Sequence, residues 1–213
     1  MGWFLPAEQE IMKQDLLSTE NAFLKSQINS HFLFNTLSYL HSSVLDVNQQ
    51  AAQTILHLSD ILRYSLTTPA SGKVKLADEL AYVSHIFQIS KFKSSKPVHL
   101  EFTITGNPGD QQVIPLILIT LAENMLKYAD FYDKGNPAKF SCQITGNSLS
   151  IFVSDKKRKS VFPFNAGIGL ENTKKRLNLA YQENYSLDII NADTRYELTL
   201  IIPLEDAIQN NNR

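Results

Sequence analysis

Residues 7–44 contain no glycine and no proline, and this long uninterrupted stretch limits what the first part of the chain can fold into. Apolar side chains recur along it every three or four residues, as they do on one face of an α-helix. The apolar positions are Ile11, Leu16, Leu17, Phe23, Leu24, Ile28, Phe32, Leu33, Leu37, Leu40 and Val44. The pattern predicts one long helix from about Pro6 to Val44.

A second helix is predicted after a short polar turn. The turn, LDVNQQ, offers Asp46 and Asn48 as turn and capping residues, and helical periodicity then runs from about Gln49 to Leu66. The short connection makes the two helices antiparallel neighbours. Their apolar stripe is wider than two helices of one chain can cover, so we expect a homodimer in which two hairpins form a four-helix bundle. We assign residues 8–68 to this helical dimerisation domain.

The chain changes character after the segment TTPASG at 67–72, which is typical of a linker. Beyond it, helical patterns alternate with stretches typical of strands, and a Gly146–Asn147 turn joins two of the strands. The predicted helices cover residues 76–92, 113–129 and 167–183; the predicted strand and hairpins cover 96–106, 138–155 and 185–204. This order predicts an α+β sandwich over residues 73–205, with one face of its sheet covered by helices.

Composition excludes several classes of protein. The formal net charge is -1, so no overall field favours nucleic acid or an anionic membrane surface. The single cysteine, Cys142, rules out a disulfide within the chain. No apolar run approaches the roughly 20 residues that span a bilayer. We therefore expect a soluble chain without direct nucleic-acid binding, attached to a membrane only through a segment upstream of MGWFLP.

Three short stretches carry residues suited to chemistry: SQINSHFLFNTL, LAENMLKYAD and AGIGLENTKKRL. His31 and Asn35 are four residues apart and share one helix face, and a neutral imidazole is a good nucleophile near pH 7. A histidine alone on a helix is, however, more often a structural residue. Gly167 and Gly169 allow close approach of backbone to phosphate where a helix starts near Leu170, although a lone pair of glycines more often marks a turn.

Two further features of these stretches concern charge. Glu123 and Asn124 lie near the end of an apolar helix, where buried oxygen atoms would suit Mg²⁺. Lys127 either reaches a phosphate or is solvated at the helix end. We interpret the run DKKRK at 155–159 as a solvated loop, and attraction of ATP is the less favoured alternative. The other histidines, His41, His57, His85 and His99, have no matching motif and are interpreted as structural.

Together these stretches resemble the LytS-like sensor histidine kinases, a bacterial family with a P-H-F-L-F-N box on its first helix. SQINSHFLFNTL matches that box, with Ser30 where the family has proline. LSDILRYSL and VKLADELAYVSHIFQISKFK are similar to the two helical segments that follow in the family. AENMLKYAD resembles the family's N box and GIGLENTKKRLNLAY its G box. All five pieces occur in the family's order, from about Leu17 to Pro203.

The resemblance implies a protein histidine kinase: ATP phosphorylates His31, and the phosphoryl group passes to an aspartate of a response regulator, expected to be a LytTR-type DNA-binding protein. Residues 73–205 would form a Bergerat-type ATP-binding domain in which Asn124 holds Mg²⁺, with Lys127, Gly167, Gly169 and Leu170 near the nucleotide. Phe32 follows His31, so the proton acceptor lies elsewhere, and Glu123 is the candidate. The expected location is the cytoplasmic side of the bacterial inner membrane.

The chain also departs from the family. Many histidine kinases carry D-x-G-x-G, whose aspartate accepts a hydrogen bond from the adenine amino group; here Asp155 is present but both glycines are missing. Tyr128 and Ala129 replace the usual histidine and glycine, and the loop at 156–166 is short for an ATP lid. Two alternatives therefore stay open: a dimeric signalling scaffold with weak or no ATP turnover, and an ATPase without phosphohistidine chemistry. The intact HFLFN argues against the second.

Overall fold

The computed structural model describes residues 29–66, 72–158 and 168–206. The chain divides into two compact units, Met1–Thr68 and Pro69–Arg213. No helix within the described ranges is both long enough and apolar enough to cross a membrane.

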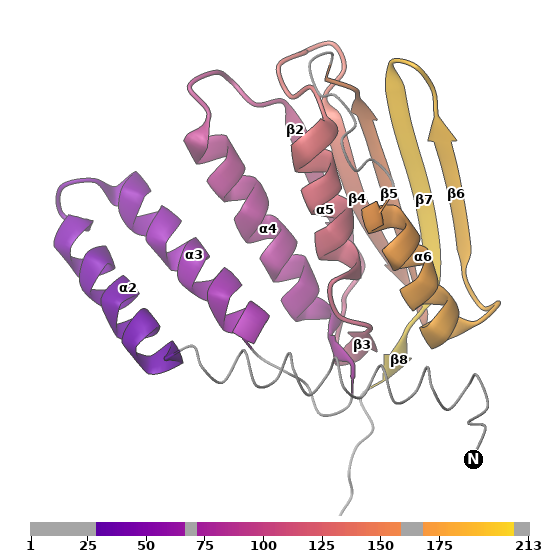
Figure 1. The fold of residues 1–213 in the computed structure, drawn as a ribbon, viewed down its shortest axis with the longest axis horizontal. Helices are drawn as coiled ribbons and strands as arrows, with labels where there is room; N and C mark the ends of the chain where they lie inside the picture. Colours follow the sequence, from indigo (N-terminus) through magenta and orange to yellow (C-terminus); the bar gives the residue numbers. More distant parts are fainter. Residues whose placement is uncertain (1–28, 67–71, 159–167, 207–213) are drawn as a thin grey trace, which may run out of the picture. The chain divides into compact units, whose positions relative to one another are not determined.

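The first unit consists of two helices that lie side by side, α2 (Ser30–Val44) and α3 (Gln49–Leu66) (Figure 1). The end of α2 and both ends of α3 agree with the sequence prediction. Asn48 caps α3 as predicted, because its side-chain oxygen accepts a hydrogen bond from the N–H of Ala51 at 3.0 Å. The guanidinium of Arg63 in α3 lies 5.1 Å from the centre of the Phe34 ring in α2 and ties the two helices together.

The prediction of one unbroken helix up to Val44 is wrong at Asn29. This residue has non-helical angles (φ -70°, ψ 83°), and its side-chain oxygen accepts a hydrogen bond from the N–H of Phe32 at 2.9 Å. An asparagine that caps in this way begins a new helix, since it satisfies a backbone N–H that has no partner within the helix. The predicted helical residues before Asn29 lie outside the described part of the chain.

The second unit is a five-stranded sheet with helices α4, α5 and α6 on one face, as the sequence predicts (Figure 1). Its strand order is β2-β4-β5-β7-β6, and a smaller sheet has the order β1-β3-β8. The elements are β1 (Val74–Lys75), α4 (Leu76–Lys93), β2 (Leu100–Thr105), β3 (Gln111–Val113), α5 (Ile117–Tyr128), β4 (Ala138–Thr145), β5 (Ser148–Lys156), α6 (Ile168–Tyr181), β6 (Ser186–Asn191), β7 (Arg195–Pro203) and β8 (Glu205–Asp206).

The core lies between the large sheet and its helices. Phe87 of α4 meets Phe102 of β2 and Phe140 of β4 edge to face, with ring centres 5.4 and 5.5 Å apart. Phe140 is paired in register with Val153 of β5, so Val153 faces the same helices. Alternate residues of a strand point to opposite faces of a sheet. These contacts therefore fix which side chains of β5 point toward the helices.

The parallel pairing of β2 with β4 and the three short strands β1, β3 and β8 were not predicted from the sequence. β2 and β4 are parallel, because β3 and α5 lie between them in the chain and carry it back across the sheet. β1, β3 and β8 are two or three residues long and are too short to show an alternating pattern. The predicted hairpin turn is correct: Gly146 has φ +54°, a left-handed conformation that glycine adopts without strain.

Candidate functional site

His31 is the second residue of α2, and its side chain is exposed. The amide nitrogen Nδ2 of Asn35, one turn further along the helix, lies 3.3 Å from each of the two ring nitrogens. An amide carries a donor on one atom and an acceptor on the other, so Asn35 can hold either tautomer of the ring. The structure thus brings together two of the predicted residues and leaves the imidazole open to solvent.

The C-terminal half of α5 carries three further predicted residues. Glu123 and Lys127 are exposed, whereas Asn124 is half-buried. The apolar stripe of α5 runs through Ala122 and Met125, and Glu123 points away from it. Asn124 thus stands at the border between core and solvent. The ammonium of Lys127 lies 5.0 Å from the centre of the neighbouring Tyr128 ring.

The start of α5 is held by a buried carboxylate that the sequence reading missed. Glu79 of α4 is fully buried, and its two oxygens accept hydrogen bonds from the N–H groups of Leu116 at 2.6 Å and Leu118 at 3.2 Å. A carboxylate at this position satisfies N–H groups that have no partner within the helix and also matches the helix dipole. The sequence contains a signal for it, since Glu79 falls on the apolar stripe of α4 between Leu76 and Leu80.

Helix α6 holds the residues just before α5. The Arg176 guanidinium donates a hydrogen bond to the carbonyl of Pro115, and the N–H of Ile114 donates to the Tyr181 hydroxyl at 3.4 Å. Neighbouring elements on two sides therefore fix where α5 begins. Because an α-helix is rigid over a few turns, they also fix where Asn124 lies two turns later.

Asp155 near the end of β5 is a buried carboxylate with an unused acceptor. Only 4% of the residue is exposed, and its oxygen Oδ2 has no hydrogen-bond partner among the residues that the structure describes. Burial raises the pKa of Asp155 to about 7, while the charge of Lys157 acts to lower it. Asp155 lies two residues beyond Val153 and therefore faces the helices. Its partner across the strands is Tyr196, whose pKa rises to about 12 through burial and the Asp155 charge.

The interpretation of the run DKKRK as a solvated loop is wrong for residues 155–158. Lys156 forms an ion pair of 2.6 Å with Asp133, which lowers the pKa of that carboxyl to about 2. The Arg158 guanidinium donates to the Ala129 carbonyl at 3.1 Å. Backbone hydrogen bonds join residues 156 and 158 to residues 130 and 128, at the end of α5. The chain after Asp155 is thus an extension of β5.

The glycine-rich stretch is described only in part. Gly169 and Leu170 lie in the first turn of α6, so the helix starts close to the predicted residue. Gly167 lies outside the described residues, as does most of the predicted lid at 156–166. The expected closeness of this stretch to a nucleotide stays a prediction.

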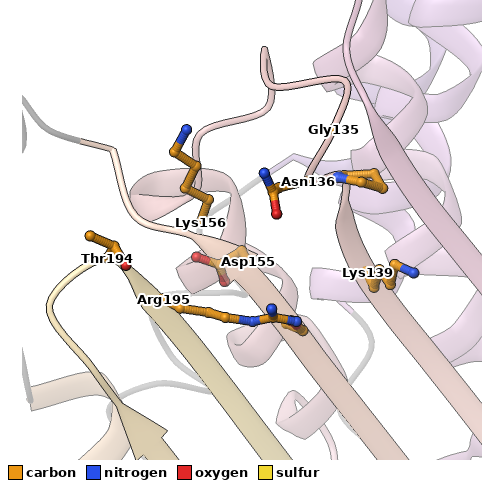
Figure 2. Close-up of a pocket in the computed structure, with 9 residues that line it drawn as sticks. Gly135, Asn136, Lys139, Asp155, Lys156, Thr194 and Arg195 are labelled. Atoms are coloured by element: carbon orange, nitrogen blue, oxygen red, sulfur yellow. The ribbon is translucent and has the colours of Figure 1, made fainter.

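A pocket of about 380 Å³ lies where β4, β5 and β7 meet the loop that follows α5 (Figure 2). Lys139, Ser154 and Arg195 line it, and strand alternation places them on the sheet face that the helices leave open. Its cations are neutralised: Lys139 lies 3.5 Å from Glu101, and the Arg195 guanidinium lies 2.8 Å from Glu197. Asp155 also contributes to its lining, but none of the predicted α5 residues does, so we do not identify this pocket with the nucleotide site.

The remaining histidines and the cysteine add no further site. Cys142 is buried, which raises the pKa of its thiol to about 12 and leaves it unreactive near neutral pH. Within the described ranges, His, Cys, Asp and Glu side chains do not gather in groups of three that could hold a metal ion.

Comparison with known proteins finds that this chain is similar to sensor histidine kinases. A family model for histidine kinases matches residues 19–98, which include His31 and Asn35. Over 206 residues the chain is 29% identical to the sensor histidine kinase BtsS of Escherichia coli strain K12, covering 95% of this chain and 36% of that protein. It is 24% identical to the sensor protein LytS of Oceanobacillus iheyensis over 216 residues, covering 94% of this chain and 37% of that protein.

The chain spans about a third of the length of these curated relatives. Among solved structures, the histidine kinase AdeS of Acinetobacter baumannii is similar over 84% of this chain and 96% of that chain, with 13% identity and a TM-score of 0.43.

Proposed function

We propose that this chain, which is similar in sequence to the LytS-like sensor histidine kinases, is the ATP-dependent kinase core of a longer two-component sensor. In this proposal His31 accepts the γ-phosphoryl group of ATP and passes it to an aspartate of a response regulator. The observation that carries the proposal is the exposed imidazole of His31, positioned by Asn35 within the segment that the family model matches. A nucleophile for phosphoryl transfer has to be exposed and oriented in this way.

In the first transfer, His31 takes the γ-phosphoryl group from ATP and ADP leaves. A lone pair on one ring nitrogen attacks the γ-phosphorus, an N–P bond forms, and the P–O bond to ADP breaks. In the neutral ring one nitrogen carries the proton and the other keeps the lone pair that attacks. The ring proton then has to leave, and Glu123 stays the candidate acceptor because its carboxylate is exposed. In the second transfer the N–P bond breaks and an O–P bond forms on the regulator.

Two side chains of the second unit, one buried and one half-buried, support nucleotide binding. Asp155 offers an unused carboxylate oxygen, which suits the amino group of adenine. Asn124 has a side-chain oxygen at the edge of the core and would hold Mg²⁺ together with the phosphates of ATP, since Mg²⁺ prefers oxygen ligands and commonly takes several from the nucleotide. The ion would neutralise charge on the phosphates during transfer.

Substitution of Asn124 tests the proposed metal ligand. With γ-labelled ATP and Mg²⁺, we expect Asn124→Ala to reduce labelling of the chain by about 100-fold, because one oxygen ligand of the ion is lost. The fold should be unchanged, as Asn124 is only half-buried. Gln143→Ala on the open face of β4 removes a similar amide and should label normally. Full labelling of Asn124→Ala would remove this residue from the site.

We also propose that the first unit forms a homodimer as a four-helix bundle. Apolar side chains on α2 and α3 remain exposed, including Phe32 (68% exposed), Leu40 (42%) and Leu58 (41%). Such a stripe in a helical hairpin is normally covered by another helix pair. The sensor kinase relatives are consistent with this arrangement.

The oligomeric state can be measured by sedimentation. At tens of micromolar we expect the chain to be a dimer and Leu58→Glu to be a monomer, because a carboxylate in the bundle interior would have to lose its hydration. Gln53→Glu adds the same charge at an exposed polar position of α3 and should leave the dimer intact. A monomeric parent chain would contradict the bundle.

A further inference from the structure

One buried residue, Asp155, indicates how the candidate nucleotide site selects a base, an inference that rests on the proposed function. Asp155 is 4% exposed, and its oxygen Oδ2 has no hydrogen-bond partner among the described residues. A buried acceptor without a protein partner is costly, and such a group commonly has a role in binding or catalysis. The carboxylate of Asp155 therefore indicates a ligand group that carries an N–H.

Lys157 lies on the same side of the sheet as Asp155. Beyond Asp155 the chain stays extended, because the N–H of Lys157 donates to the carbonyl of Thr194 at 2.9 Å while Lys156 and Arg158 bond to the end of α5 on the other side. Residues two apart in an extended strand point to the same face. The Lys157 side chain is thus next to Asp155 on the helix-covered face, and the two charges attract.

Among the described residues, the side chains before and after Lys157 are already paired, whereas the ammonium of Lys157 is not. The Lys156 ammonium pairs with Asp133 and the Arg158 guanidinium with the Ala129 carbonyl. Within the described residues the ammonium of Lys157 has neither a hydrogen bond nor an ion pair with a contact distance below 4 Å. Its side chain is half-buried, so it is neither fully solvated nor enclosed. A donor is therefore available beside the unused acceptor.

We propose that Lys157 is a specificity-determining residue of the nucleotide site, whose ammonium and the Asp155 carboxylate together read the edge of adenine. On that edge an amino group, a donor, stands next to the ring nitrogen N1, an acceptor. The amino group would donate to Asp155 and Lys157 would donate to N1. Hypoxanthine carries a carbonyl and an N–H at these two places, so both interactions would be lost or repulsive. Sites built from such paired groups discriminate strongly because the wrong ligand leaves them unsatisfied.

The pair also predicts a dependence on pH. Asp155 accepts the amino hydrogen only when it is ionised, and burial raises its pKa to about 7. ATP binding should therefore strengthen as the pH rises through about 7 and weaken below it. Lys157 on the same strand acts to lower this pKa, and Tyr196 on β7 is the other titratable group that interacts with Asp155. Removal of the Lys157 charge should shift the pH dependence to higher pH.

The test is calorimetry of ATP and ITP binding to the full chain with Mg²⁺ present. For Lys157→Met we expect about tenfold weaker ATP binding, the loss of one charged hydrogen bond, with a smaller change for ITP and a midpoint of the pH dependence above that of the parent. Lys157→Arg keeps the charge and should restore part of the preference for ATP. Lys139→Met removes an exposed lysine of the opposite face and should change neither affinity.

The outcomes separate this inference from the proposed function. Equal losses for ATP and ITP would mean that Lys157 contacts the phosphates, and unchanged ATP binding would mean that it contacts nothing; either result overturns the inference and leaves the kinase proposal standing. ITP binding as tight as ATP binding in the parent chain would also overturn it. Absence of binding of either nucleotide to the parent chain would contradict the proposed function itself.

Discussion

His31→Gln is expected to abolish phosphorylation of the chain. With γ-labelled ATP and Mg²⁺, the parent chain should acquire a label that is lost in acid and stable in alkali, as a phosphoramidate is, whereas the variant should show only background. Glutamine is polar and of similar length, but it has no ring nitrogen with a basic lone pair that could attack phosphorus. The side chain is exposed and its removal leaves the core unchanged, so the effect should be on chemistry alone.

His41→Gln is the matched control for this prediction. His41 lies on the same helix and is half-buried, and the residue four positions further along the chain is Leu45, where His31 has Asn35. Its variant should label like the parent chain. Label that persists in His31→Gln would place the phosphoacceptor elsewhere. A parent chain that binds ATP but never acquires label would favour the dimeric signalling scaffold, the alternative that the missing glycines after Asp155 left open.

Long elements could be predicted because their apolar patterns extend over several turns or strand repeats. The limits of α3, the hairpin of β4 and β5 and the placement of helices on one face of the sheet all followed from such local patterns. His31 and Asn35 could be paired in advance for the same reason, since helical spacing alone puts them on one face. These features depend on residues that are close in the sequence, so they could be predicted from it.

Features that depend on distant residues could not be predicted in this way. Asn29 looked like an ordinary helical position, and only its hydrogen bond to Phe32 shows that a new helix begins there. The run after Asp155 looked solvated because its charges are obvious in the sequence, whereas its partners, Asp133 and Ala129, are more than 20 residues away. A run of charged residues predicts exposure to solvent when the partners of those charges are far away in the sequence.

Glu79 is the position where we expect the largest loss of stability. Its carboxylate caps α5 through two hydrogen bonds, and Leu116, the first residue that it holds, has a left-handed backbone (φ 66°) that is strained for leucine. Glu79→Ala would leave two N–H groups without their acceptor and a cavity where the side chain was. We expect a loss of about 4 kcal/mol in the free energy of unfolding, and about half of that for Glu79→Gln, which keeps one acceptor oxygen.

The measurement has to report on the second unit, so hydrogen exchange at the amides of β4, β5 and β7 is the appropriate probe. A loss of about 4 kcal/mol is a large part of the stability of an ordinary domain and should accelerate exchange of these amides together. Glu101→Ala, which removes an exposed carboxylate 3.5 Å from Lys139, should cost less than about 1 kcal/mol. If Glu79→Ala cost as little as this control, the start of α5 would be held by Arg176 and Tyr181 of α6 instead. Asn124, two turns further along, would then owe its position to α6 rather than to α4.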